Sequence, residues 1–150
     1  MYTVETTTSF EAAHRLYSVE TYAEECRDNI HGHSYKVKVV IGRPELNSSG
    51  MVIDFKLLKE IIRTEIEKKY DHSCILRQND PLAEPIMTNC KKVFIVQDNP
   101  TAEWMSKMFF DILVDRLSKL DDQLRVVSVS VQETENNIAT YSAGGRCKCE

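Results

Sequence analysis

The segment HGHSYKVKVVIG, residues 31–42, sets the fold class because apolar and polar side chains alternate along it. Four apolar positions would share one face of a strand: Tyr35, Val37, Val39 and Ile41. Lys36 and Lys38 fall on the opposite face. This alternation is typical of a strand with one buried face in an antiparallel sheet. We therefore expect an antiparallel sheet that is covered on one side.

The residues that follow this strand predict a return and then a helix. ELNSSG, residues 45–50, has the composition of a turn, and MVIDF, residues 51–55, reads as a short strand. Asp54 is placed to cap a helix that runs to about Lys69. The apolar stripe of that helix is Leu58, Ile61, Ile62 and Ile66.

A second helix is predicted to open at DNPTAEW, with Asn99 as N-cap and Pro100 in the first helical position. Its apolar stripe is Met105, Met108, Phe109, Ile112 and Leu117. LRVVSVSVQET, residues 124–134, is a further alternating strand with Val127, Val129 and Val131 on the same face as Glu133. KKVFIVQ, residues 91–97, could be a strand or a lid over a site. Helices are too few for a parallel α/β sheet, so the order of elements indicates the α+β class.

Composition narrows the kind of protein. The chain has 150 residues, 42% of them apolar and 28% charged, which suits one globular domain over residues 1–150. No apolar run reaches about 18 residues, and the N-terminus lacks the form of a signal peptide. A net charge of −4 disfavours nucleic acid as a partner. Five irregularly spaced cysteines are no disulfide framework, so we expect reduced thiols, no membrane and a cytoplasmic location.

The histidines suggest a metal site. The chain has four, and His31 and His33 would project from the same face of a strand. Gly32 between them would let the backbone bend or approach a ligand. A third ligand, His14 or His72, would give the three-ligand, open-position arrangement of catalytic zinc. The alternative is that the pair consists of ordinary core or surface residues.

Two other residue groups could transfer protons. In YDHS, residues 70–73, Asp71 could fix the tautomer of His72 if the chain turns there, which is a general-base arrangement. The alternative for His72 is a solvated helix C-terminus. Cys26 near a metal and imidazoles would be driven towards the thiolate, or it is a buried apolar residue. Cys147 and Cys149 are an incomplete metal site, to which we assign no role.

Six blocks together resemble a known family. FEAAHRL, CRDNIHGHSY, GMVIDF, YDHSCIL, NPTAEW and VQET occur in the order and spacing of the 6-pyruvoyltetrahydropterin synthase family, which includes the 6-carboxytetrahydropterin synthases of the queuosine pathway. The resemblance implies the tunnelling fold (T-fold), a four-stranded antiparallel sheet with two helices on one side. It also implies trimers that close into a barrel, and a homohexamer with active sites at subunit interfaces.

The resemblance also implies roles for individual residues. The zinc ligands would be His14, His31 and His33. The proton-transfer groups would be Cys26, Asp71 and His72. The substrate-binding residues would be Thr101, the pterin-anchoring Glu103, and Glu133 as a second acid in the pocket. The substrate implied is 7,8-dihydroneopterin triphosphate, and Zn²⁺ is the cofactor; no nicotinamide or flavin motif is present.

The sequence leaves three pterin products open: 6-carboxy, 6-pyruvoyl and 6-hydroxymethyl. Queuosine-pathway enzymes place three residues between the cysteine and the first histidine and animal pyruvoyl-forming enzymes place five, whereas RDNI supplies four here. Another branch uses a glutamate in place of the cysteine and releases 6-hydroxymethyl-7,8-dihydropterin for folate synthesis. Glu25 directly precedes Cys26, so it is a possible second base or a solvated loop acid. A pterin-binding protein without turnover is the non-enzymatic alternative.

Overall fold

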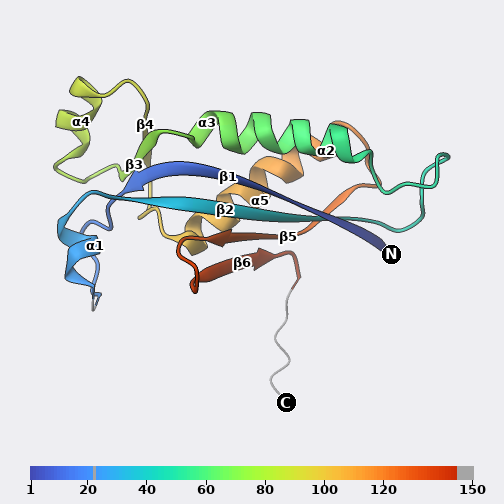
Figure 1. Cartoon of the computed structure of the whole chain (residues 1–150), viewed down its shortest axis with the longest axis horizontal. Helices are drawn as coiled ribbons and strands as arrows, with labels where there is room; N and C mark the ends of the chain where they lie inside the picture. Colours follow the sequence, from blue (N-terminus) through green and yellow to red (C-terminus); the bar gives the residue numbers. More distant parts are fainter. Residues whose placement is uncertain (22, 145–150) are drawn as a thin grey trace, which may run out of the picture.

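A computed structural model describes residues 1–21 and 23–144, and its centre is a six-stranded sheet in the order β4-β3-β1-β2-β5-β6 (Figure 1). The strands are β1 (Tyr2–His14), β2 (His31–Arg43), β3 (Ser73–Arg77), β4 (Val93–Val96), β5 (Arg125–Gln132) and β6 (Ile138–Ser142). β1, β2, β5 and β6 are antiparallel neighbours, as expected. The two short strands β3 and β4 extend the sheet in parallel beside β1.

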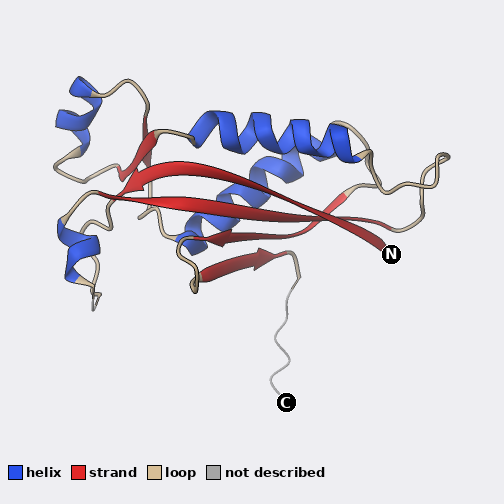
Figure 2. Ribbon diagram, viewed as in Figure 1, coloured by secondary structure: helices blue, strands red, loops and turns tan. Residues whose placement is uncertain are grey.

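The helices separate into two long ones over the sheet and two short ones near its end. They are α1 (Glu24–Asp28), α2 (Phe55–Ile62), the π-helical turn η1 (Arg63–Glu67), α3 (Lys68–Tyr70), α4 (Ala83–Asn89) and α5 (Ala102–Ser118). α2, η1 and α3 form one continuous helix, which with α5 covers one face of the sheet (Figure 2). The α+β class with two main helices is therefore confirmed. Among these described segments, no helix is long and apolar enough to cross a membrane.

The core lies between the long helices and the inner face of the sheet. Phe10 of β1 and Tyr35 of β2 are cross-strand partners whose rings stack at 5.1 Å between centroids. Phe109 of α5 meets Phe10 edge-on at 5.9 Å. On the opposite face Lys36 and Lys38 are exposed. The predicted alternation of β2 is confirmed.

The helix that opens at Asp54 begins as predicted, but the strand expected before it is wrong. The Asp54 carboxylate accepts hydrogen bonds from the backbone N–H groups of Lys56 and Leu57 at 2.8 and 3.0 Å, which is N-capping. Residues 51–54 form a loop, and no strand includes them. The apolar side chains of Val52 and Ile53 are instead buried in the core from this loop, 4% and 6% exposed. A short apolar run does not by itself distinguish a strand from a buried loop.

The start of α5 differs from the prediction by two residues. Thr101, not Asn99, is the N-cap, and its hydroxyl accepts a hydrogen bond from the N–H of Trp104. Asn99 instead donates from its side chain to the Tyr17 carbonyl, and Pro100 precedes the helix. The predicted stripe is otherwise confirmed, with Met105, Phe109 and Leu117 buried and Met108 and Ile112 packed against the core.

Strand β5 is present, but one of its side chains faces the other way. The pairing register with β2 shifts between Val40 and Ile41, which marks a bulge. Val126 is therefore buried, and Val127 does not share the inner face with Val129. Of the two alternatives for residues 91–97, the structure has the strand, β4.

Candidate active site

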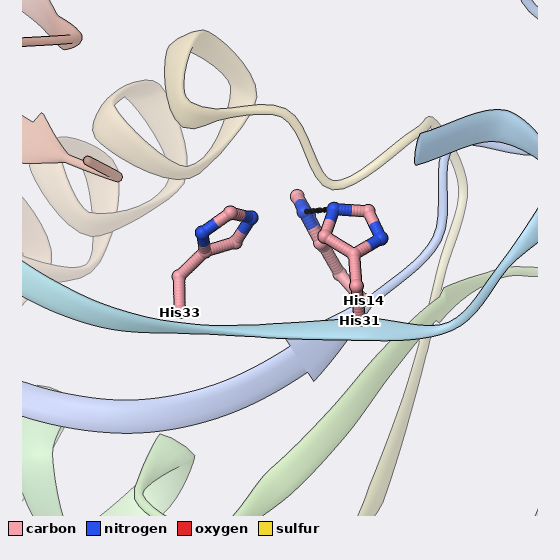
Figure 3. Close-up of side chains that lie close together, drawn as sticks. All are labelled: His14, His31 and His33. Carbon is pink, nitrogen blue, oxygen red and sulfur yellow. Dashed lines mark hydrogen bonds between the residues drawn. The ribbon is translucent and has the colours of Figure 1, made fainter. Parts of the chain in front are cut away.

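Three histidines meet at one end of the sheet. His14 is the last residue of β1 and pairs directly with His31, the first residue of β2. His33 lies two residues further along β2, so all three side chains project from the inner face. Potential ligand atoms of the three rings lie within 4.8 Å of one another (Figure 3). This group could hold a metal ion.

Two backbone carbonyls orient the rings. His14 donates from Nδ1 to the carbonyl of Pro100 at 2.8 Å, and His31 donates from Nδ1 to the carbonyl of Asn29 at 3.0 Å. A histidine whose Nδ1–H is held in this way presents the lone pair of Nε2, as metal-ligating histidines do. The two Nε2 atoms face each other at 3.0 Å. Two lone pairs at that distance repel unless a cation or a proton lies between them.

Burial favours the metal ion over the proton. It lowers the pKa of His14 to about 4; the hydrogen bond to Pro100 opposes this, and the neighbouring His31 and His33 reinforce it. Burial also lowers the pKa of His33, against the attraction of Glu133. The Nε2 of His33 is buried without a hydrogen-bond partner. Imidazole nitrogens gathered in this way, on histidines two of which have a pKa lowered by burial, fit a zinc ion.

An acidic side chain borders the cluster. Oε1 of Glu133 lies 3.4 Å from Nε2 of His14 and 3.8 Å from Nε2 of His33. Glu133 directly follows β5, and its carboxylate is about a quarter exposed. Tyr35, next to His33 on the inner face, is fully buried with its hydroxyl unpartnered. Burial raises the pKa of Tyr35, and the nearby acidic groups of Glu133 and Cys26 raise it further, which keeps the phenol neutral.

A recess of about 560 Å³ adjoins the cluster through Glu133. Its walls are Leu16, Thr101, Ala102, Glu103, Glu133, Asn136, Asn137, Ile138 and Ala139. The volume is within the range of small-molecule sites. Glu103 is exposed in the first turn of α5, where the helix dipole favours an anion. The three residues expected to bind substrate therefore surround one recess.

Cys26 is held near the same end of the sheet. It lies in α1, half-buried, and its carbonyl accepts a hydrogen bond of 3.0 Å from the N–H of Leu16, a wall residue of the recess. Glu25 precedes it on α1 and is exposed. The roles assigned to both residues remain predictions.

Asp71 and His72 form a pair on the other side of the sheet. The chain turns at His72, whose φ is 56°, and this turn brings Nδ1 of His72 to 2.9 Å from Oδ2 of Asp71. A hydrogen bond from the N–H of Glu11, followed by the contact with His72, lowers the pKa of Asp71. His72 is 80% exposed and borders a depression lined by residues of β1 and β2, which include the outward Glu11 and Ser34 and also His33 of the cluster. Among the described residues of one chain, no hydrogen bond or ion pair joins the pair to the histidine cluster.

Packing among the described residues does not require a glycine at position 32, and several site groups were not predicted. Among residues 1–21 and 23–144, a Cβ on Gly32 would meet only the Ala12 carbonyl, at an ordinary 3.5 Å. The carbonyls of Asn29 and Pro100 left no signal in the sequence, because every residue has a carbonyl. Tyr35 was predicted to face inward, but its unpartnered hydroxyl becomes visible only once the strands are packed.

Three histidines beside a small-molecule recess, on a sheet covered by two helices, have the ligand number of a catalytic metal site with an open position. The sequence profile described as 6-pyruvoyl tetrahydropterin synthase matches residues 3–144. The chain belongs to this family.

Relatives and solved structures agree with this assignment. A 6-carboxy-5,6,7,8-tetrahydropterin synthase from Aquifex aeolicus is 34% identical over 88% of this chain and 92% of its own length. One from Rickettsia conorii is 32% identical over 85% and 90%. The structure of 6-pyruvoyl tetrahydropterin synthase from Caenorhabditis elegans superposes with a TM-score of 0.66 at 30% identity, covering 94% of both chains. An uncharacterized protein from Wolinella succinogenes gives 0.80 at 25% identity, over 95% and 98%. The tunnelling fold is confirmed.

Proposed function

We propose that this protein is a zinc-dependent lyase that converts 7,8-dihydroneopterin triphosphate to a tetrahydropterin. The first choice of product is 6-carboxytetrahydropterin, and 6-pyruvoyltetrahydropterin is the alternative of the same reaction type. The observation that carries the proposal is the cluster of His14, His31 and His33, whose Nε2 atoms converge beside a recess edged by carboxylates. The names of the Aquifex and Rickettsia relatives favour the carboxy product.

The recess would bind the pterin ring. Glu103 presents two carboxylate oxygens, which match the 2-amino group and the adjacent ring N–H of a pterin as a bidentate acceptor. Thr101 fixes the first turn of α5 from which Glu103 projects. Glu133 lies between the recess and the histidines. A ring held by Glu103 would therefore direct its 6-substituent towards the metal ligands.

The histidines would hold zinc, which when bound polarises the side-chain oxygens of the substrate and acidifies the adjacent C–H and O–H groups. Cys26 would exchange a proton with the side chain of the substrate from one side. His72 would do so from the other, with Asp71 stabilising its charged form at 2.9 Å. A reduced thiol is needed for this role, so we propose the cytoplasm as the compartment.

His72 would reach the substrate from a second copy of the chain. Asp71 and His72 border the open face of the sheet, whereas the three histidines lie on the covered face. We therefore propose that the single domain of residues 1–150 assembles as a homohexamer of two barrel-forming trimers, with each site completed across an interface.

Product analysis tests the function. Protein loaded with zinc and incubated with 7,8-dihydroneopterin triphosphate should give one tetrahydropterin, identified by chromatography against 6-carboxy and 6-pyruvoyl standards. Cys26→Ala should abolish the product while the metal content stays at the wild-type level, because the thiol transfers protons and is not a ligand. If the wild-type protein binds the pterin without converting it, the chain is a pterin-binding protein and the enzymatic proposal is wrong.

A second candidate product is 6-hydroxymethyl-7,8-dihydropterin. The observation behind it is that Glu25 directly precedes Cys26 on the same short helix, α1. If Glu25 is the base for side-chain cleavage, Glu25→Ala should suppress the hydroxymethyl product and Cys26→Ala should spare it. A single carboxy product that is indifferent to Glu25→Ala rejects this candidate.

A further inference from the structure

We propose that Glu133 is a displaceable fourth ligand of the metal: its carboxylate occupies the open position beside the three histidines in the resting protein, and a ligand entering the recess takes that position from it. The inference rests on the metal site proposed above and adds a role for the acid that borders it.

The distances support ligation rather than hydrogen bonding. Oε1 of Glu133 lies 3.4 and 3.8 Å from Nε2 of His14 and His33, which is beyond the usual 2.7–3.2 Å of an N–H···O hydrogen bond. Two ligand atoms bound at about 2.0–2.1 Å to one tetrahedral zinc ion are separated by roughly 3.4 Å. The carboxylate oxygen therefore lies at a ligand–ligand distance from Nε2 of His14 and slightly farther from Nε2 of His33.

The charges around Glu133 also favour its ligation to a metal ion. Among residues 1–21 and 23–144, no lysine or arginine forms an ion pair with Glu133; its two close partners are His14 and His33. The Glu133 carboxylate is about three-quarters buried without a lysine or arginine partner among those residues, and a divalent ion at the histidines would supply a positive charge beside it.

The position of Glu133 explains why the bond would be displaceable. Its backbone N–H is held by the Asn137 carbonyl at 3.1 Å, in the connection between β5 and β6. Its side chain lines the recess together with Glu103. A molecule filling the recess must therefore contact the same carboxylate that meets the histidines. An oxygen-bearing substituent directed at the histidines would compete with Glu133 for the metal.

Zinc affinity tests the inference. Metal-free protein is titrated with zinc in competition with a chromophoric chelator. Glu133→Gln and Glu133→Ala should weaken zinc binding by at least about tenfold. Mutation of residues that only hydrogen-bond to metal ligands already lowers metal affinity by about 10–100-fold. Glu135→Gln is the matched control: it removes the same charge from an exposed position two residues away and should leave the affinity unchanged. Circular dichroism checks that each variant is folded.

Cobalt substitution provides a spectroscopic readout. The visible d–d bands of the Co²⁺ protein should differ between wild type and Glu133→Ala. Addition of 7,8-dihydroneopterin, which carries side-chain oxygens but no triphosphate, should shift the wild-type bands and bring the two spectra together. Equal zinc affinity and identical cobalt spectra without pterin would overturn the role of Glu133.

The two proposals fail differently. His31→Ala should abolish zinc binding whatever Glu133 does. If the wild type takes up no zinc, or if His31→Ala retains it, the metal site itself is wrong. If His31→Ala loses zinc while both Glu133 variants bind it as the wild type does, only the inference about Glu133 is wrong.

Discussion

His14 takes part in strand pairing, in holding the loop before α5 and in the candidate metal site. It ends β1, faces His31 across the sheet and donates to the Pro100 carbonyl of the loop before α5. It is 1% exposed. An imidazole buried in this way is tolerated because it stays neutral and has a hydrogen-bond partner.

This burial predicts a pH dependence of stability for the metal-free protein. The pKa of His14 falls from 6.5 to about 4 on folding, so between these values the unfolded chain binds the extra proton. Stability should be complete above about pH 6.5 and decrease as the pH falls to about 4, by about 3 kcal/mol from His14. The lowered pKa of His33 acts in the same direction. Urea unfolding at a series of pH values measures it.

The control for this pH dependence is His14→Phe, which keeps a ring but cannot titrate. Its free energy of unfolding should lose most of the slope between pH 4 and pH 6.5. A slope equal to that of the wild type would assign the effect to other groups.

Glu103 gives a second prediction at the level of a single side chain. Glu103→Gln keeps the size but replaces an acceptor oxygen with a donor amide that would face the donors of the pterin. Pterin binding should weaken by about 1–3 kcal/mol, the cost of unpaired polar groups. Calorimetry with 7,8-dihydroneopterin measures this, and an affinity within twofold of the wild type would remove Glu103 from the pocket.

Helices and strands with a strong hydrophobic periodicity were predictable from the sequence, whereas the short helices were not. β2 and the helix after Asp54 have patterns long enough to define one buried face. Helices α1 and α4 were not predicted, because α1 has no buried residue and α4 has only Ala83. Their positions depend on contacts with distant segments, such as the bond from Leu16 to Cys26.

The cap of α2 is a local feature that can be tested separately. Asp54→Ala removes the acceptor of two backbone N–H groups, so the free energy of unfolding should fall by about 1 kcal/mol. Asp54→Ser keeps a capping oxygen and should recover most of the loss. Urea denaturation at neutral pH compares the three proteins, and equal midpoints for wild type and Asp54→Ala would contradict the capping role.

At the scale of the whole molecule, the sequence identified the candidate site residues but did not predict how they are arranged in space. Motif resemblance named His14, His31 and His33, and strand pairing explains why they meet. Nothing in the local pattern indicated that Asp71 and His72 would lie on the opposite face. That separation depends on the parallel pairing of β3 beside β1, a long-range contact.

Subunit complementation tests whether the two faces act in one site. His31→Ala and His72→Ala proteins should each be inactive, and mixed oligomers formed by co-refolding should recover part of the activity, because some interfaces combine two intact halves. Sedimentation should give a species of six times the 17.3 kDa chain mass. A monomer, or mixed oligomers without recovery, would contradict a shared site.

The uninterrupted pairing of β1 with β2, from Tyr2 opposite Arg43 to His14 opposite His31, makes the metal centre a reporter of correct folding. A slip of one residue turns every side chain of a strand to the other face, so His14 would face away from His31 and His33. A deletion within β1 would therefore erase metal uptake even where the hairpin still closed. Zinc content would then count the correctly aligned molecules in a preparation, which secondary-structure spectra cannot do.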